Sequence, residues 1–235
     1  MACHALIPAA GSGTRAESAI PKQYRALCGE PMLAHSVAAL ASVAEVDSVT
    51  VVLAPADRWD QDAAAIRLRE RFGLRIRFLH CGGATRAETV ANALRRLEDA
   101  ADTDWILVHD AARPCLEPSA VRELIAALAD DEAGGLLAWP VADTVKRASA
   151  DGRVAATVPR DGLWLAQTPQ MFRKQLLRRA YAAYPEATDE AGAVESLGLK
   201  PLLRPGQLTN MKVTYPGDFD IAETILRARN ASVSP

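Results

Sequence analysis

The sequence predicts a doubly wound α/β fold built on a mostly parallel sheet. Two patterns lead to this prediction: short apolar runs alternate with helical patterns over the first half of the chain, and a glycine loop follows the first apolar run. Alternating strands and helices form parallel sheets with right-handed crossover connections. A third feature modifies the prediction, because residues 135–169 carry no helical pattern. We expect this stretch to form a β-arm that projects from the core.

The elements of the first half follow one another regularly. Residues 32–42 place Leu33, Val37 and Leu40 at i, i+4 and i+7, which is the spacing of an amphipathic helix. Residues 48–53 predict a buried strand that Pro55 stops, and Pro118 suits the first turn of a helix that ends near Leu128. The other strands are expected at 5–7, 75–79 and 105–108, and the other helices at 58–72 and 88–97.

The arm is expected at about residues 138–168. Strand patterns occur at 136–145, 153–158 and 163–166, with turn signals at 151–152 and 161–162, both Asp-Gly. An isolated hairpin is marginally stable in water, so the arm must pack on something. A second copy of the chain is one possibility, and the arm's own sheet is the other. Beyond Gln175 the helical patterns return, and we expect a short strand at 211–214 and a last helix at 218–228.

Composition and charge exclude several classes of protein. The 235 residues are 49% hydrophobic and 24% charged, which rules out disorder over most of the length. A formal net charge of −2 argues against a broad surface for nucleic acid or membranes. Apolar runs fall short of the roughly 18 residues of a membrane span, and the start lacks the basic segment of a signal peptide. The four cysteines are widely spaced, so we expect free thiols in a reducing, cytoplasmic location.

The glycine loop at residues 8–15 (PAAGSGTR) is expected to hold a phosphate, because small residues let backbone N–H groups approach one closely. Its Gly11-x-Gly13 spacing also fits the dinucleotide fingerprint of nicotinamide-dependent oxidoreductases. That fingerprint needs a helix at the glycines and a second strand within about 30 residues. Here Pro21 would break the helix and the next strand begins near Ser48, so the oxidoreductase fails on spacing. The Walker A sequence is absent, and a mere tight turn is the remaining alternative.

The loop and the Pro21-Lys22-Gln23 sequence after it resemble the signature of sugar-nucleotide pyrophosphorylases and, among them, cytidylyltransferases. Further motifs follow in order: Gly82-Gly83-x-x-Arg86-x-x-Thr89, His109-Asp110-Ala-Ala-Arg113-Pro114, Asp143-Thr144-Val-Lys146, Arg160-x-Gly162-Leu163-Trp164, Gln167-Thr168-Pro169-Gln170, Thr188-Asp189-Glu190-Ala191 and Asn210-Met-Lys212-Val-Thr214. Together they resemble the 2-C-methyl-D-erythritol 4-phosphate cytidylyltransferase family of the non-mevalonate isoprenoid pathway. The resemblance covers almost the whole chain, so we expect one Rossmann-like nucleotidyltransferase domain over residues 1–235.

The resemblance implies transfer of CMP from CTP to the phosphate of 2-C-methyl-D-erythritol 4-phosphate, with release of pyrophosphate. A phosphate monoester with a second pKa near 6 is mostly anionic at pH 7, so the attack needs no strong base. An anion must instead approach an anionic α-phosphate, a problem that positioning and fixed positive charge solve. The sequence fits this demand, since its candidate residues are Arg and Lys and it lacks a nucleophile-elbow signature.

The same resemblance implies a set of site residues. The catalytic residues would be Arg15, Lys22, Arg160 and Lys212. The nucleotide would contact Pro8, Ala9, Ala10, Gly11, Ser12, Gly13, Gly82, Gly83 and Thr89. The phosphorylated polyol would contact Asp110, Ala111, Arg113, Thr144, Thr168 and Thr188. Asp110 follows the 105–108 strand, at the edge where doubly wound sheets bind ligands, and could also help to hold Mg²⁺.

The implied partners are CTP, a phosphorylated polyol, Mg²⁺ carried mainly by CTP, and a second copy of the chain that is bound through the arm. In the family the arm crosses to the neighbouring subunit, so Thr144 and Arg160 would complete the neighbour's site. Three other functions compete with this one. They are a ribitol 5-phosphate cytidylyltransferase of the same fold, a non-catalytic nucleotide-binding regulator and, more remotely, the oxidoreductase.

Overall fold

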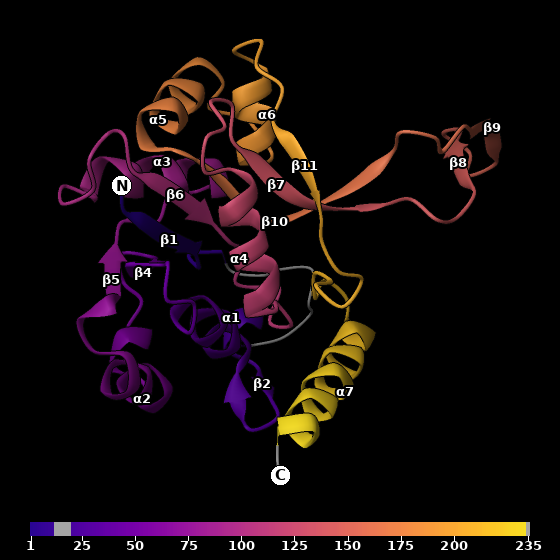
Figure 1. Ribbon diagram of the computed structural model, residues 1–235. Helices are drawn as coiled ribbons and strands as arrows, with labels where there is room; N and C mark the ends of the chain where they lie inside the picture. Colours follow the sequence, from indigo (N-terminus) through magenta and orange to yellow (C-terminus); the bar gives the residue numbers. More distant parts are fainter. Residues whose placement is uncertain (12–19, 234–235) are drawn as a thin grey trace.

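The computed structural model describes residues 1–11 and 20–233, and it confirms the doubly wound α/β fold (Figure 1). A seven-stranded sheet forms its centre, in the order β11-β7-β10-β6-β1-β4-β5. The strands are β1 (Cys3–Pro8), β4 (Ser48–Leu53), β5 (Ile76–His80), β6 (Trp105–Val108), β7 (Gly135–Pro140), β10 (Trp164–Arg173) and β11 (Leu202–Pro205). Only β10 runs antiparallel to its neighbours within this sheet.

Helices cover both faces of the sheet (Figure 1). One face packs against α1 (Met32–Ala41), α2 (Ala63–Phe72) and α4 (Pro118–Ala127), and the other against α3 (Arg86–Arg96), α5 (Lys174–Ala183) and α6 (Glu190–Glu195). Alternation along β1 divides its side chains between the two cores, since Ala5 and Ile7 face one core and Leu6 the other. A smaller core lies beneath α7 (Pro216–Val233), where Phe219 packs near Leu27.

The chain reverses its direction of winding between β1 and β6. From β1 the chain proceeds outward through β4 and β5, and then returns to the other side of β1 to form β6. Ligands bind at such a switch point, outside the carboxyl ends of the strands. Residues that follow β1, β5 and β6 therefore share one edge of the sheet, which is where residues 9–11 of the glycine loop, Gly82-Gly83 and Asp110 lie.

The arm exists, but its strands differ from those expected. The expected strand at 136–145 is two strands, because β7 ends at Pro140 and β8 (Val145–Ala148) begins later. β8 pairs with β9 (Val154–Val158) at the tip, which Figure 1 shows standing away from the body. The expected strand at 163–166 is the outer end of β10, which continues into the sheet. The expected strand ended before Pro169, but β10 continues through this proline. The β7–β10 register shifts between Ala166 and Gln170, and a strand tolerates a proline at such an irregularity.

Two other expectations about strands are wrong. Residues 211–214 form no strand; Val213 N donates to the carbonyl of Ala112 at 2.8 Å, but no ladder forms. The late strand is instead β11, which pairs with β7 at the edge of the sheet. Its leucines are half-exposed and prolines flank it, so its pattern is not that of a buried strand.

The remaining differences are short elements. The expected helix at 58–72 is a 3₁₀ turn, η3 (Trp59–Gln61), followed by α2, whose N-cap Asp62 accepts from Ala64 N at 2.8 Å. A second 3₁₀ turn, η4 (Gly73–Arg75), follows α2, and η2 (Lys22–Tyr24) precedes the hairpin of β2 (Ala26–Leu27) and β3 (Glu30–Pro31). No helix of the described residues is long and apolar enough to cross a membrane. The four cysteines are free thiols, as expected.

Candidate functional site

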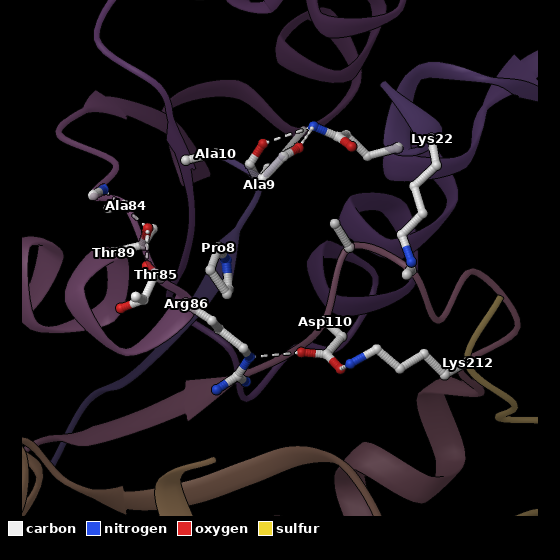
Figure 2. Close-up of a pocket in the computed structure, with 15 residues that line it drawn as sticks. Pro8, Ala9, Ala10, Lys22, Ala84, Thr85, Arg86, Thr89, Asp110 and Lys212 are labelled. Carbon is white, nitrogen blue, oxygen red and sulfur yellow. Dashed lines mark hydrogen bonds and ion pairs between the residues drawn. The ribbon is translucent and has the colours of Figure 1, made fainter. Parts of the chain in front are cut away.

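A pocket of about 620 Å³ lies at the switch-point edge of the sheet (Figure 2). The residues lining it come from the ends of β1, β5 and β6, from η2, from the start of α3 and from the loop before α7. They are Pro8, Ala9, Ala10, Gly11, Lys22, Gln23, Gly83, Ala84, Thr85, Arg86, Thr89, Asp110, Ala111, Ala112 and Lys212. Many were expected from the sequence, although Ser12, Gly13 and Arg15 lie outside the described residues.

The described part of the glycine loop is held by Gln23. Its buried amide Nε2 donates to the carbonyls of Ala9 and Gly11, both at 2.9 Å (Figure 2). On the other side, Gly82 packs so closely on Ala10 that a Cβ at Gly82 would collide with the Ala10 side chain. Gly82 therefore brings two loops together and does not itself line the pocket as the structure describes it.

Thr89 positions the neighbouring segment. Its hydroxyl accepts from Gly83 N at 3.0 Å and donates to the Thr85 carbonyl at 2.9 Å. Thr85 caps α3, since its hydroxyl accepts from Glu88 N at 3.0 Å. The N-terminus of α3 thus borders the pocket, and the partial positive charge of a helix N-terminus favours a phosphate there.

Asp110 is the centre of an ion cluster. Its Oδ1 accepts from Arg86 Nε at 2.9 Å and its Oδ2 lies 2.7 Å from Lys212 Nζ (Figure 2). Arg113 Nε is 3.8 Å from Oδ2. Burial alone would raise the pKa of this carboxyl, but Arg86, Lys212 and Arg113 outweigh it and hold the pKa far below the usual range. Asp110 is therefore ionised throughout the physiological range.

The lysines converge on the same side of the pocket. Lys22 Nζ donates to the carbonyl of Val213 at 3.0 Å, next to Lys212 in the chain. Lys212 itself lies in a loop and not in the expected strand. With Arg86 they place three cationic side chains on the wall of one pocket, where Asp110 is the single lining carboxylate among the described residues.

Arg86 is the main lining residue that the sequence analysis left out of the site. It makes a forked pair with Glu190, with Nη1–Oε1 at 2.8 Å and Nη2–Oε2 at 3.0 Å. Burial would lower its pKa, but Glu190 and Asp110 raise the pKa well above the usual value. Gln23 was also left out. Both residues stand in motifs that the sequence shows, Arg86 in Gly82-Gly83-x-x-Arg86 and Gln23 in Pro21-Lys22-Gln23, and this could have assigned them to the site.

Two of the expected substrate residues are buried behind Asp110. Thr168 accepts from Asp110 N at 3.0 Å, and its hydroxyl lies 2.9 Å from His109 Nδ1. A carbonyl can only accept, so His109 Nε2 donates to the Arg113 carbonyl at 3.2 Å, and Nδ1 of the neutral ring accepts the proton of the Thr168 hydroxyl. Arg113 in turn donates to the carbonyls of Asn210 and Ala166, at 2.7 and 3.1 Å.

Three of the expected residues are not brought to the pocket within this chain. Thr144 and Arg160 are exposed on the arm, where Arg160 donates to the carbonyl of Ala142. Thr188 is exposed just before α6. Their expected roles stay predictions, as do those of the residues at the pocket.

A metal ion would find few protein ligands here. Across residues 1–11 and 20–233, no three His, Cys, Asp or Glu side chains are grouped to hold one. Asp110 is the only carboxylate among the described residues that line the pocket, and cations already engage both of its oxygens. Mg²⁺ binds through one or two carboxylates and substrate phosphates, so the residues present fit an ion that arrives with a polyphosphate.

The chain is similar to known proteins over nearly its whole length. The family model described as IspD, 2-C-methyl-D-erythritol 4-phosphate cytidylyltransferase, matches residues 3–228. The proteins of that name from Dechloromonas aromatica and Chromobacterium violaceum are 54% and 55% identical to the chain, and each match covers 96% of this chain and 98% of the relative. The crystal structure of a 4-diphosphocytidyl-2C-methyl-D-erythritol synthase superposes with a TM-score of 0.82 at 44% identity, over 96% of this chain and 98% of that one.

His109 predicts a specific dependence of stability on pH. Burial lowers its pKa from 6.5 to about 4, so the folded protein keeps it neutral while the unfolded chain protonates it near 6.5. Protons then favour the unfolded chain, and stability is lost as the pH falls from 6.5 towards 4. His109→Gln keeps a donor for the Arg113 carbonyl and removes this titration. Urea unfolding at pH 7.5 and pH 5 should show a smaller loss of unfolding free energy for the variant; equal losses would contradict the assignment.

Proposed function

The chain belongs to the 2-C-methyl-D-erythritol 4-phosphate cytidylyltransferase family, and from that premise we propose that its pocket transfers CMP by fixed positive charge. An oxygen of the phosphate of 2-C-methyl-D-erythritol 4-phosphate attacks the α-phosphorus of CTP. The bond between the α-phosphorus and its bridging oxygen to the β-phosphate breaks, and pyrophosphate leaves. The product is 4-diphosphocytidyl-2-C-methyl-D-erythritol, an isoprenoid precursor.

The observation that carries the proposal is the convergence of Lys22, Arg86 and Lys212 on a pocket at the N-terminus of α3. Contacts within the protein hold these groups in position, so little reorganisation is needed as charge builds on the transferring phosphoryl group. Lys22, with Arg15 as its expected partner, stabilises the transition state. Lys212 orients the attacking phosphate. Arg86 keeps N–H groups for a phosphate even while Glu190 and Asp110 hold it, because a guanidinium has five donors and a lysine has three.

The cytosine is recognised by backbone groups. Ala9, Ala10 and Gly83 line the pocket, and the Gly82–Ala10 contact sets the distance between their loops. Peptide N–H and C=O groups held in this way can match the N4 donor and N3 acceptor that distinguish cytosine from uracil. Gln23 and Thr89 act indirectly here, because each holds one of the two loops.

Mg²⁺ arrives with CTP, and Asp110 is the residue that would help to hold it. When bound, the ion neutralises charge on the triphosphate and on the leaving pyrophosphate. Asp110 has a second task, which is to hold Arg86 and Lys212 in place.

The acceptor site is completed by a second copy of the chain. Arg160 and Thr144 are exposed on an arm that stands away from the body (Figure 1), and neither lines this chain's own pocket. Exposed apolar side chains on the arm support burial against a partner: Val154, Leu163, Trp164 and Leu165. Arg160 and Thr144 then join Arg113, Thr168 and Thr188 around the polyol phosphate of the neighbouring subunit. The whole chain acts as one catalytic domain, and its four free thiols suit the cytoplasm.

The direct test is pyrophosphate release from CTP and Mg²⁺, with 2-C-methyl-D-erythritol 4-phosphate and ribitol 5-phosphate in parallel. We expect rapid release with the first acceptor, because relatives at 54–55% identity carry its name. Release with ribitol 5-phosphate alone would keep the chemistry but change the acceptor. A folded protein that binds CTP and releases pyrophosphate with neither would contradict the proposal.

Mixed dimers test the shared site. Lys22→Ala is expected to lower kcat by about 100-fold or more with little change in CTP affinity, because its charge acts mainly in the transition state. Arg160→Ala is expected to raise KM for the polyol phosphate. A dimer of one chain of each kind has one site with both residues intact, so verified mixed dimers should regain about half of the wild-type activity. The assay is run with the polyol phosphate well below the raised KM of Arg160→Ala, and mixed dimers no more active than the mean of the two parent dimers would overturn the exchange of arms.

A further inference from the structure

Glu190 is a fully buried carboxylate that the proposed reaction does not use. It is the first residue of α6, its exposed fraction is 0%, and it is not among the described residues that line the pocket. A buried carboxylate loses its hydration at a cost of several kcal/mol, which a close ion pair roughly offsets. Such a pair is therefore weak evidence for a stabilising role, and the contacts of Glu190 indicate another one.

The geometry of Glu190 is directed at Arg86. Both carboxylate oxygens accept from the two terminal nitrogens of Arg86, at 2.8 and 3.0 Å. Tyr181 on α5 donates its hydroxyl to Oε1 at 2.7 Å. The third nitrogen of Arg86, Nε, donates to Asp110 at 2.9 Å. The guanidinium plane is thus held at three nitrogens by two carboxylates, one on each side.

Arg86 keeps some of its N–H donors for a ligand. A guanidinium has five N–H groups, and the recorded hydrogen bonds of Arg86 use three of them. Among the described residues, the second N–H of each terminal nitrogen has no partner; these two N–H bonds lie on opposite edges of the guanidinium, and Arg86 lines the pocket. Since the group is planar, the direction of these two N–H bonds is set by Glu190 and Asp110.

Glu190 itself is fixed to the sheet. Gln170 on β10 donates from Nε2 to Asp189 Oδ2 at 2.9 Å, and its Oε1 accepts from Ala191 N at 2.8 Å. One amide therefore holds the residues on either side of Glu190. Thr188, an expected acceptor residue, lies two positions earlier, so the same turn serves both the acceptor side and Arg86.

We infer that Glu190 is a positioning residue, which fixes the plane of the Arg86 guanidinium, aims its remaining N–H beside Asp110 at the phosphates and never contacts substrate itself. The inference rests on the proposed function. It predicts that Glu190→Gln, which keeps the shape and removes the charge, lowers kcat/KM for CTP by about 10- to 100-fold, because small errors in position are costly in phosphoryl transfer.

A double-mutant cycle provides the readout that a merely structural role would not give. If Glu190 acts through Arg86, then adding Glu190→Gln to Arg86→Gln produces no further loss of kcat/KM or of CTP affinity. The double variant also removes both buried charges together, so neither is left unpaired. Lys174→Gln is the matched control, because Lys174 is buried and bonded to the carbonyls of Leu97 and Ala100 but lies away from the pocket. It should lower stability and leave kcat/KM within about twofold.

The results distinguish a failure of the proposed function from a failure of the positioning role of Glu190. If the wild-type chain releases no pyrophosphate with the methylerythritol phosphate, the proposed function fails. If the wild-type chain is active and Glu190→Gln equals it, or the double variant is a further tenfold worse than Arg86→Gln, the positioning role fails alone. If Glu190→Gln does not fold, Tyr181→Phe loosens the same carboxylate. It should cause a smaller loss in the wild type and none in Arg86→Gln; an equal loss in both would overturn the inference.

Discussion

The buried carboxylate of Asp110 is the contact on which the site depends. It follows β6 at the switch point of the sheet and meets Arg86 from α3 and Lys212 from the loop before α7, with Arg113 close behind. These segments are far apart in the sequence, and their cationic side chains would repel one another if the carboxylate were removed. Asp110 thus joins the two walls of the pocket, while the chain Asp110–Thr168–His109–Arg113 ties it to β10.

In the proposed reaction, this arrangement would promote attack by one anion on another through fixed positive charge, without a strong base. Lys22, Arg86 and Lys212 outnumber the single carboxylate on the described wall, so the pocket keeps an excess of positive charge that incoming phosphates neutralise. Because Asp110 and Glu190 hold Arg86, and Asp110 also holds Lys212, the alignment of these cations requires little reorganisation during the reaction. In the proposed dimer the arm would bring Arg160 to the site of the neighbouring chain.

Much of the fold could be predicted from local patterns in the sequence. The strands at 48–53 and 105–108 are continuous apolar runs buried on both faces, and their bounds agree with the structure. The sequence did not predict β11, because an exposed edge strand flanked by prolines lacks a continuous apolar run. Residues 211–214 were predicted as a strand, but no strand lies beside them to pair with. The Arg86–Glu190 contact spans 104 positions, and no periodicity carries that information. Both residues lay inside quoted motifs, but only the fold shows that they meet.

The most direct measurement is the effect of Asp110→Asn on CTP affinity and on kcat, taken together. Removing a carboxylate from a cationic pocket leaves more positive charge, so ground-state binding of the triphosphate should hold or tighten. The cations lose their alignment, so kcat should fall by about 100-fold. Weaker CTP binding with kcat intact would contradict the account, because it would make Asp110 a simple substrate ligand and not the organiser of the site.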